Sequence, residues 1–185
     1  MIPPRTEIMT SLFGAWCLIR FDPRGLNYFN HTVDGFWRSF FAAVIALPLF
    51  LTLSIIHAHE AEAGRSISTS IHLLRYALGW VVFPAVMVIL TRLLDRTGHY
   101  ASYIIVLNWM AVPQWALVLG VSSVGMALGG AVGDLIPMLL LVLLLCYDFF
   151  ITRLVLNIGI GKTVLVVTIG VLLGIILDAL ILRLS

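Results

Sequence analysis

Five histidine and carboxylate side chains lie within a short stretch of this sequence, and such groups are common ligands of transition metals. Their spacing matches no defined metal motif, and the same residue types are ordinary in an exposed polar loop. We therefore expect no metal site and no cofactor. The five residues are His57, His59, Glu60, Glu62 and His72.

A second group of polar residues falls inside strongly apolar segments. Ionisable residues are costly inside a membrane and are usually paired there, so we expect Arg75 to pair with Asp178 or Asp134. Such a pair serves as a structural clamp or, alternatively, as part of an ion or proton pathway. The side-chain amide of Asn108 also needs a hydrogen-bonding partner, and Asn108 either joins two helices or contacts a substrate. Arg75, Asp134, Asp178 and Asn108 form the predicted intramembrane polar cluster.

The sequence contains no catalytic motif. It has no glycine-rich phosphate loop, nucleophile elbow, HExxH motif or paired-carboxylate arrangement. We expect no catalytic residues and no enzymatic activity, with a lipid-modifying membrane enzyme as a remote alternative. A formal charge of +2 is too small to suggest a nucleic-acid partner. Cys17 and Cys146 have no spacing typical of a metal site or disulfide framework.

The elements that carry these residues are apolar and long. Of 185 residues, 61% are hydrophobic and 11% are charged, more apolar surface than a soluble domain of this size can bury. The apolar runs are continuous over about 20 residues, which indicates membrane-spanning helices rather than a barrel. The sequence therefore predicts an all-α, polytopic membrane bundle. Its five transmembrane helices are expected at about 36–57, 70–93, 100–122, 130–149 and 163–183.

Each of the first four spans has a proline near its middle. Proline removes one backbone hydrogen bond and clashes with the preceding turn, so we expect helix kinks at these positions. Ordinary kinks are one interpretation, and a functional cavity at the membrane midplane is the other. The four prolines are Pro48, Pro84, Pro113 and Pro137.

Glycines four residues apart lie in or near the last three spans. Small residues at this spacing let helix backbones approach closely, within one chain or between copies. We expect them to pack the fourth and fifth helices tightly. These positions are Gly125, Gly129, Gly133, Gly170 and Gly174.

Residues 1–35 differ from the rest and are predicted to form a separate N-terminal lead before a transmembrane domain of residues 36–185. Met9, Phe13 and Trp16 share a stripe at helical spacing, which is typical of an amphipathic helix lying in the membrane interface. Packing of this helix on the protein's own spans is the alternative. Asp22-Pro23 is expected to end it.

Basic residues predict the orientation, because Lys and Arg favour the cytoplasmic side. With the N-terminus inside, eight lie on the cytoplasmic side and three on the other. The C-terminus would then be periplasmic in a bacterial inner membrane. The eight are Arg5, Arg20, Arg24, Arg38, Arg92, Arg96, Arg153 and Lys162, and the three are Arg65, Arg75 and Arg183.

Short aromatic motifs resemble those of inner-membrane proteins of alphaproteobacteria, which are in turn similar to the Yip family of five-span membrane proteins. The resemblance implies a five-helix membrane fold and supplies no catalytic residue. Only about 35 residues precede the first span, too few for the N-terminal region with which eukaryotic Yip proteins bind Rab-type GTPases, so that role is not transferred. The motifs are Phe21-Asp22-Pro23, Gly35-Phe36-Trp37-Arg38-Ser39-Phe40-Phe41, Arg75-Tyr76, Gly79-Trp80, Phe83-Pro84 and Asn108-Trp109.

The sequence favours a non-enzymatic integral membrane protein that acts as a scaffold or accessory subunit of a membrane complex. Its expected partners are the lipid bilayer and other membrane subunits or copies of itself, with no nucleic acid. The alternative is a small channel or transporter with a midplane cavity lined by kinked helices.

Overall fold

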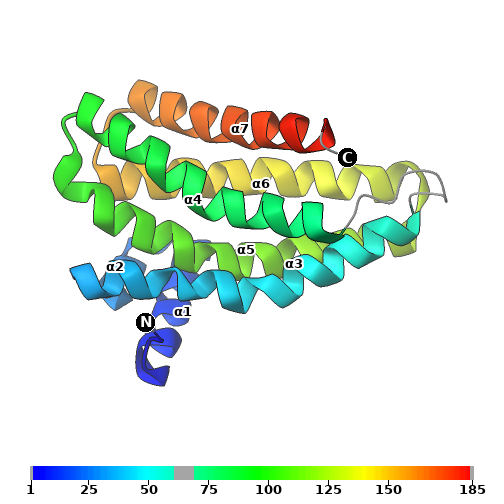
Figure 1. Ribbon diagram of the computed structural model, residues 1–185, viewed down its shortest axis with the longest axis horizontal. Helices are drawn as coiled ribbons and strands as arrows, with labels where there is room; N and C mark the ends of the chain where they lie inside the picture. The colour runs from blue at the N-terminus through cyan, green and yellow to red at the C-terminus, as the bar shows by residue number, and fades with distance from the viewer. Residues whose placement is uncertain (1, 61–68, 184–185) are drawn as a thin grey trace.

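The computed structural model describes residues 2–60 and 69–183, apart from the side chains of residues 57–60, 69, 70, 134 and 182. Over these residues the chain is helical and contains no strand, which confirms the predicted all-α class. The long helices run side by side along the longest axis of the molecule (Figure 1). In chain order the elements are α1 (Arg5–Ile19), η1 (Pro23–Tyr28), α2 (Val33–Ser39), α3 (Phe41–Glu60), α4 (Thr69–Leu93), η2 (Thr97–His99), α5 (Tyr100–Leu128), α6 (Gly130–Leu156) and α7 (Ile160–Leu182).

Five segments of the described chain are long and apolar enough to cross a membrane, as the sequence predicts. A helix rises about 1.5 Å per residue, so about 20 residues match the ~30 Å hydrocarbon core of a bilayer. The first segment combines α2 with α3, which are separated only at Phe40. The segments are Val33–Ile56, Ile71–Leu93, Thr97–Leu128, Gly130–Leu156 and Ile160–Ile181.

The third and fourth segments are longer than predicted, and residues 123–128, which were expected to lie between the two spans, belong to the helix α5. α5 continues to Leu128, and Gly129, with a φ of 61°, ends it immediately before α6. α6 then continues past Asp148 to Leu156, where Asn157 adopts the left-handed conformation. The boundaries were misplaced because neither an isolated glycine nor a single acid is sufficient to stop a helix.

The four mid-span prolines lie inside continuous helices. Pro48 is in α3, Pro84 in α4, Pro113 in α5 and Pro137 in α6. Each leaves one backbone carbonyl without its usual donor, and other groups take that role in membrane helices. The bending expected at these positions stays a prediction.

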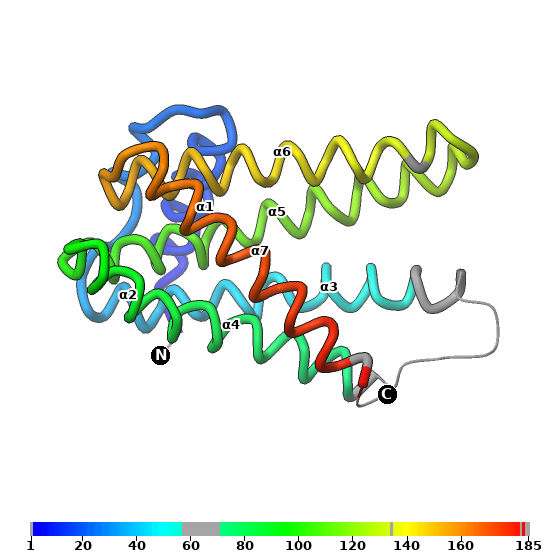
Figure 2. The backbone as a smooth tube through the Cα atoms, turned by 90° about the horizontal axis from the view of Figure 1, so that it is seen from above, coloured from blue at the N-terminus to red at the C-terminus, as the bar shows by residue number. Residues whose placement is uncertain are grey.

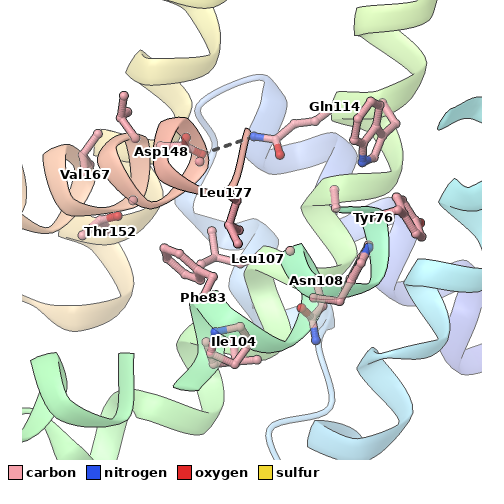
Figure 3. Close-up of a pocket in the computed structure, with 18 of the residues that line it drawn as sticks. Tyr76, Phe83, Ile104, Leu107, Asn108, Gln114, Asp148, Thr152, Val167 and Leu177 are labelled. Carbon is pink, nitrogen blue, oxygen red and sulfur yellow. Dashed lines mark hydrogen bonds between the residues drawn. The ribbon is translucent and has the colours of Figure 1, made fainter. Parts of the chain in front are cut away.

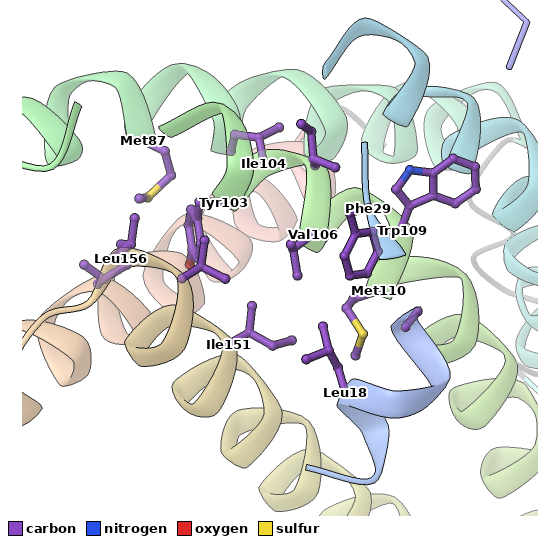
Figure 4. Packing of buried hydrophobic residues seen from close by; sticks show 14 of the residues in the cluster. Leu18, Phe29, Met87, Tyr103, Ile104, Val106, Trp109, Met110, Ile151 and Leu156 are labelled. Atoms are coloured by element: carbon purple, nitrogen blue, oxygen red, sulfur yellow. The ribbon is translucent and has the colours of Figure 1, made fainter. Parts of the chain in front are cut away.

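The long helix α5 lies at the centre of the bundle. The segments α1, α2, α3, α4 and α6 all contact it. Four consecutive α5 residues from Tyr103 to Val106 are buried, so all sides of the helix are covered there. Figure 4 shows them packed with Trp109 and Met110 against Leu18, Met87, Ile151 and Leu156.

The N-terminal helix α1 packs against η1 and α5 through a different face from its aromatic stripe. Its buried residues are Ser11, Gly14, Ala15 and Leu18, whereas Met9, Phe13 and Trp16 are exposed. Residues of this segment therefore share one core with the long helices. The N-terminal segment predicted for residues 1–35 packs on the bundle, and the side chains of Met9, Phe13 and Trp16 remain exposed.

Polar contacts fix the N-terminal segment in place. Arg38 of α2 forms an ion pair with Glu7 of α1, with 2.9 Å between Nη1 and Oε2. Asp22 caps η1 by accepting a hydrogen bond from the backbone N–H of Arg24, as expected from the Asp22-Pro23 break. The guanidinium of Arg24 also binds the Asp22 carboxylate, and these hydrogen bonds lower the pKa of Asp22 below its usual value.

The two ends of the bundle differ in charge. One end holds α1, η1 and α2 together with the α4–α5 and α6–α7 turns, and the other holds the α5–α6 turn and the end of α7 (Figure 2). Arg96 donates a hydrogen bond to the backbone oxygen of Asn157 and joins the two turns at the first end. The eight basic residues assigned to one side by the sequence lie in elements at this end, hereafter the basic end.

Candidate functional site: a polar cavity inside the bundle

A cavity of about 390 Å³ lies between α4, α5, α6 and α7, with Phe50 of α3 at its edge. Although the surrounding helices are strongly apolar, polar side chains from four of them reach this cavity (Figure 3). We call it the central cavity. Its polar and amphipathic lining residues are Arg75, Tyr76, Trp80, Tyr103, Asn108, Gln114, Trp115, Asp148, Thr152 and Asp178.

Helical spacing explains how one face of α7 reaches the cavity. Gly170, Gly174 and Asp178 follow one another at four-residue steps, so they share one side of the helix, and all three line the cavity. A Cβ atom at Gly170 would lie 3.2 Å from the Phe83 ring of α4, so this glycine permits close packing. Gly174 has nothing within 4 Å of such a Cβ and leaves open space instead.

An ion pair joins α4 to α7 at the cavity. The Nε atom of Arg75 donates a hydrogen bond to Oδ1 of Asp178. This is one of the two pairings expected from the sequence. Both side chains are about two-fifths exposed, so the pair lies at the mouth of the cavity rather than in the packed core. Asp134, the other expected partner, belongs to α6, and its side chain lies outside the described residues.

Asn108 has the buried partner that its amide requires. Its Nδ2 atom donates a hydrogen bond of 2.9 Å to Oγ of Ser39, which in turn donates to the backbone oxygen of Phe36. This chain connects the middle of α5 to the end of α2. Asn108 therefore lines the cavity and also joins two helices.

The structure adds an acidic residue that sequence reasoning missed. Asp148 projects from α6 into the central cavity and accepts a hydrogen bond from Nε2 of Gln114, at 3.4 Å (Figure 3). The sequence suggested a span end at residue 149 and so placed Asp148 at the membrane surface. The signal available was the uninterrupted helical pattern as far as Asn157, which puts Asp148 about two turns inside the helix.

Aromatic rings form another part of the wall. Tyr76 lies 4.7 Å from Phe50, 5.9 Å from Trp80 and 6.4 Å from Trp115, measured between ring centroids. The Tyr76 hydroxyl donates a hydrogen bond to the backbone oxygen of Ala43, which fixes the ring between α3, α4 and α5. These rings give the cavity a rigid apolar and π-rich surface.

Only some of the glycines and prolines singled out in the sequence line the cavity. Gly125 and Gly133 face each other across the α5–α6 hairpin, where a Cβ at Gly125 would lie 3.0 Å from the Gly133 carbonyl oxygen. Gly129 forms the turn itself. Of the four prolines, only Pro84 is among the described residues lining the cavity, and its carbonyl oxygen accepts a hydrogen bond from Tyr100.

The histidine and glutamate stretch forms no site that can be described. The side chains of His57, His59, Glu60 and Glu62 lie outside the described residues, whereas His72 is partly buried in α4. Within the described part of the chain, no three His, Cys, Asp or Glu side chains are grouped closely enough to hold a metal ion.

A second hollow lies between α6 and α7 and is almost wholly apolar. It encloses about 1030 Å³ and extends from Val142 to Asn157, with Phe21 at one edge. Arg153 is the charged residue among its described lining residues. Its lining resembles the apolar outer surface of the surrounding helices, so the central cavity, with its polar groups, is the better candidate for a functional site.

The fold and the cavity together define a class: a helical chain with five segments of membrane-crossing length and a polar cavity among them. No family model matches the chain, and neither the curated proteins nor the solved structures contain a match to it.

Proposed function

We propose that this is a multi-pass membrane protein that binds a small solute in its central cavity and moves it through the bilayer, as a small channel or transporter. The observation that supports this most directly is the grouping of Asp148, Gln114, Asn108 and the Arg75–Asp178 pair around one hollow. Polar groups at membrane depth are expensive and commonly mark a solute or ion path. A bundle that served only to support other subunits would have no need of such a hollow.

The scaffold or accessory-subunit role, which the sequence favoured, is the competing proposal. One reason for it was the glycine spacing, which suited contact between subunits. Gly125 and Gly133 contact each other within the chain, so the glycine spacing gives less support to contact between subunits. Under either proposal the protein is non-enzymatic, and the resemblance to the Yip family stays an expectation about its architecture.

The proposed placement in the bilayer follows from charge and aromatic residues. The basic end is assigned to the cytoplasmic side of a bacterial inner membrane and the end of α7 to the periplasmic side. Phe13 and Trp16 of α1, both at least half exposed, would then lie among the lipid headgroups as an interfacial anchor.

Cysteine labelling tests the proposed solute path without knowledge of the solute. Ala111 lines the central cavity, whereas Leu141 is 56% exposed on the outer face of α6. A charged thiosulfonate reagent reacts with a thiol only where water allows thiolate to form. In a background with Cys17→Ser and Cys146→Ser, we expect Ala111→Cys to be labelled in membranes and Leu141→Cys to stay unlabelled. Equal resistance of both cysteines would contradict a solute path and favour the scaffold role.

A further inference from the structure

The charges of the central cavity do not balance. Arg75 and Asp178 neutralise each other at its mouth. Asp148 is the other carboxylate in the wall, and Arg75 is the one Lys or Arg among the described lining residues. The only hydrogen bond to Asp148 within the described chain comes from the neutral amide of Gln114. An ionised Asp148 thus leaves the empty cavity with one net negative charge.

An unpaired carboxylate in an apolar interior is strongly unfavourable, and a partner of positive charge relieves this cost. Gln114 is suited to assist such a partner. Its Nε2 donates to Asp148, and its carbonyl oxygen remains available to accept a hydrogen bond from a ligand N–H group. The charged part of a ligand would thus meet two acceptors close together.

The rest of the wall favours an organic ligand over a bare ion. Tyr76, Trp80 and Trp115 present aromatic surface, and aromatic faces attract organic cations. A volume of about 390 Å³ is within the range of roughly 300–1,000 Å³ that is usual for small-molecule sites. A dehydrated metal ion would need several oxygen ligands, and the described lining supplies one unpaired carboxylate.

We propose that the solute of the central cavity is a small organic cation, an amine or quaternary ammonium compound, with its positive charge against Asp148 and its apolar part among Tyr76, Trp80 and Trp115. This inference rests on the solute path proposed above and names its chemical class.

Two aromatic probes of opposite charge test the proposal on the purified full chain in lipid nanodiscs. We expect benzyltrimethylammonium to bind saturably and benzenesulfonate to fail to bind, as measured by calorimetry. The variant Asp148→Asn keeps the shape of the side chain and removes its charge, so it should weaken binding of the cation at least about tenfold. The matched control Asp34→Asn, on the exposed side of α2, should leave the affinity unchanged. Binding of both probes, or undiminished binding by Asp148→Asn, would overturn the proposal.

Infrared spectroscopy examines the same residue without relying on affinity. A protonated Asp148 gives a neutral-acid carbonyl band that is missing in Asp148→Asn. We expect no such band in the wild type saturated with benzyltrimethylammonium. Its persistence would show that a proton, rather than the organic cation, balances the charge.

The labelling assay distinguishes failure of this inference from failure of the proposed function. Benzyltrimethylammonium should slow the labelling of Ala111→Cys, and benzenesulfonate should not. If Ala111→Cys is labelled at the same rate with either probe, the proposed solute path stands, but the proposal that the solute is a cation is refuted. An unreactive Ala111→Cys refutes the path itself.

Discussion

Arg75 and Asp178 are 103 positions apart in the sequence, yet the guanidinium of one donates a hydrogen bond to the carboxylate of the other. The pair connects the start of α4 to the end of α7, which also contact each other where Gly170 lies against the Phe83 ring. It also defines the mouth of the central cavity. Its loss should therefore affect both the stability of the bundle and access to the cavity.

The first prediction concerns this pair. Arg75→Gln or Asp178→Asn leaves one charge without its partner in a partly exposed position, and we expect each to destabilise the protein by about 1–3 kcal/mol, between the values for surface and buried pairs. The reversed pair, Arg75→Asp with Asp178→Arg, should regain at least half of the loss. Thermal unfolding in detergent measures these changes. Arg92→Gln, at an exposed site in the last turn of α4, is the control and should be neutral.

The second prediction concerns the α5–α6 hairpin. In Gly125→Ala the new methyl group would lie 3.0 Å from the carbonyl oxygen of Gly133, so the two helices must separate. We expect a loss of about 1–3 kcal/mol, typical of overpacking. Gly120→Ala makes the same change in α5 with nothing within 4 Å, and it should be neutral or stabilising. Equal unfolding temperatures for the two variants would contradict this account of the hairpin.

The third prediction concerns the hydrogen bond between Asn108 and Ser39. In Ser39→Ala the buried Nδ2 group of Asn108 loses its acceptor, and we expect a cost of about 1–2 kcal/mol. Ser123→Ala removes a hydroxyl that is exposed and bonds only to its own helix, so its effect should stay within about 0.5 kcal/mol. Denaturation of both variants under the same conditions provides the comparison.

The fourth prediction concerns pH at the N-terminal turn. Hydrogen bonds from Arg24 lower the folded-state pKa of Asp22 below its unfolded value. The stabilising contribution of Asp22 is therefore fully present above the unfolded pKa of about 3.9 and is lost as the pH falls through the lower folded value. We expect Arg24→Ala to move the pKa of Asp22 back toward its usual value. Titration of the Asp22 side-chain carboxyl by NMR measures the shift, and an unchanged pKa would show that Arg24 is not its cause.

The fifth prediction concerns topology. An alkaline phosphatase moiety, active only in the periplasm, should be active when fused after residue 185 and inactive when fused after Asn157, in the α6–α7 turn at the basic end. Activity at both positions, or the reverse pattern, would contradict the proposed orientation. Immunoblots that show equal amounts of the two fusions control for expression.

The sequence was sufficient to predict the helical class, the five apolar segments and an ion pair of Arg75 with either Asp178 or Asp134, of which the structure shows Asp178. Apolar runs of this length are expected to be helices, because a helix satisfies all of its own backbone hydrogen bonds. Charged residues at similar depths in two such runs are candidates to pair with each other. Asp148 was not found in this way, because its depth depends on where α6 ends. The helical pattern of α6 continues past residue 149, and Asn157 ends the helix in the left-handed conformation.

The N-terminal helix shows the same limit. The sequence suggested that a stripe including Met9 and Phe13 would lie in the membrane interface, and it did not identify Ser11, Gly14 and Ala15 as buried residues. Gly14 permits close approach of η1, because a Cβ at this position would lie 2.8 Å from the carbonyl oxygen of Gly25. Hydrophobic patterning identifies the apolar side chains, but steric fit decides which face makes the contact.

The enclosure of α5 around Tyr103–Val106 has a consequence for the order in which the protein folds. A ribosome synthesises α1, α2, α3 and α4 before α5, so each of these helices is made before one of the surfaces that it contacts in the folded bundle. A chain halted before residue 100 would retain two long apolar helices, but its α1 could pack on η1 and not on α5. Final packing of the N-terminal half therefore requires the third long helix, α5, to be in place.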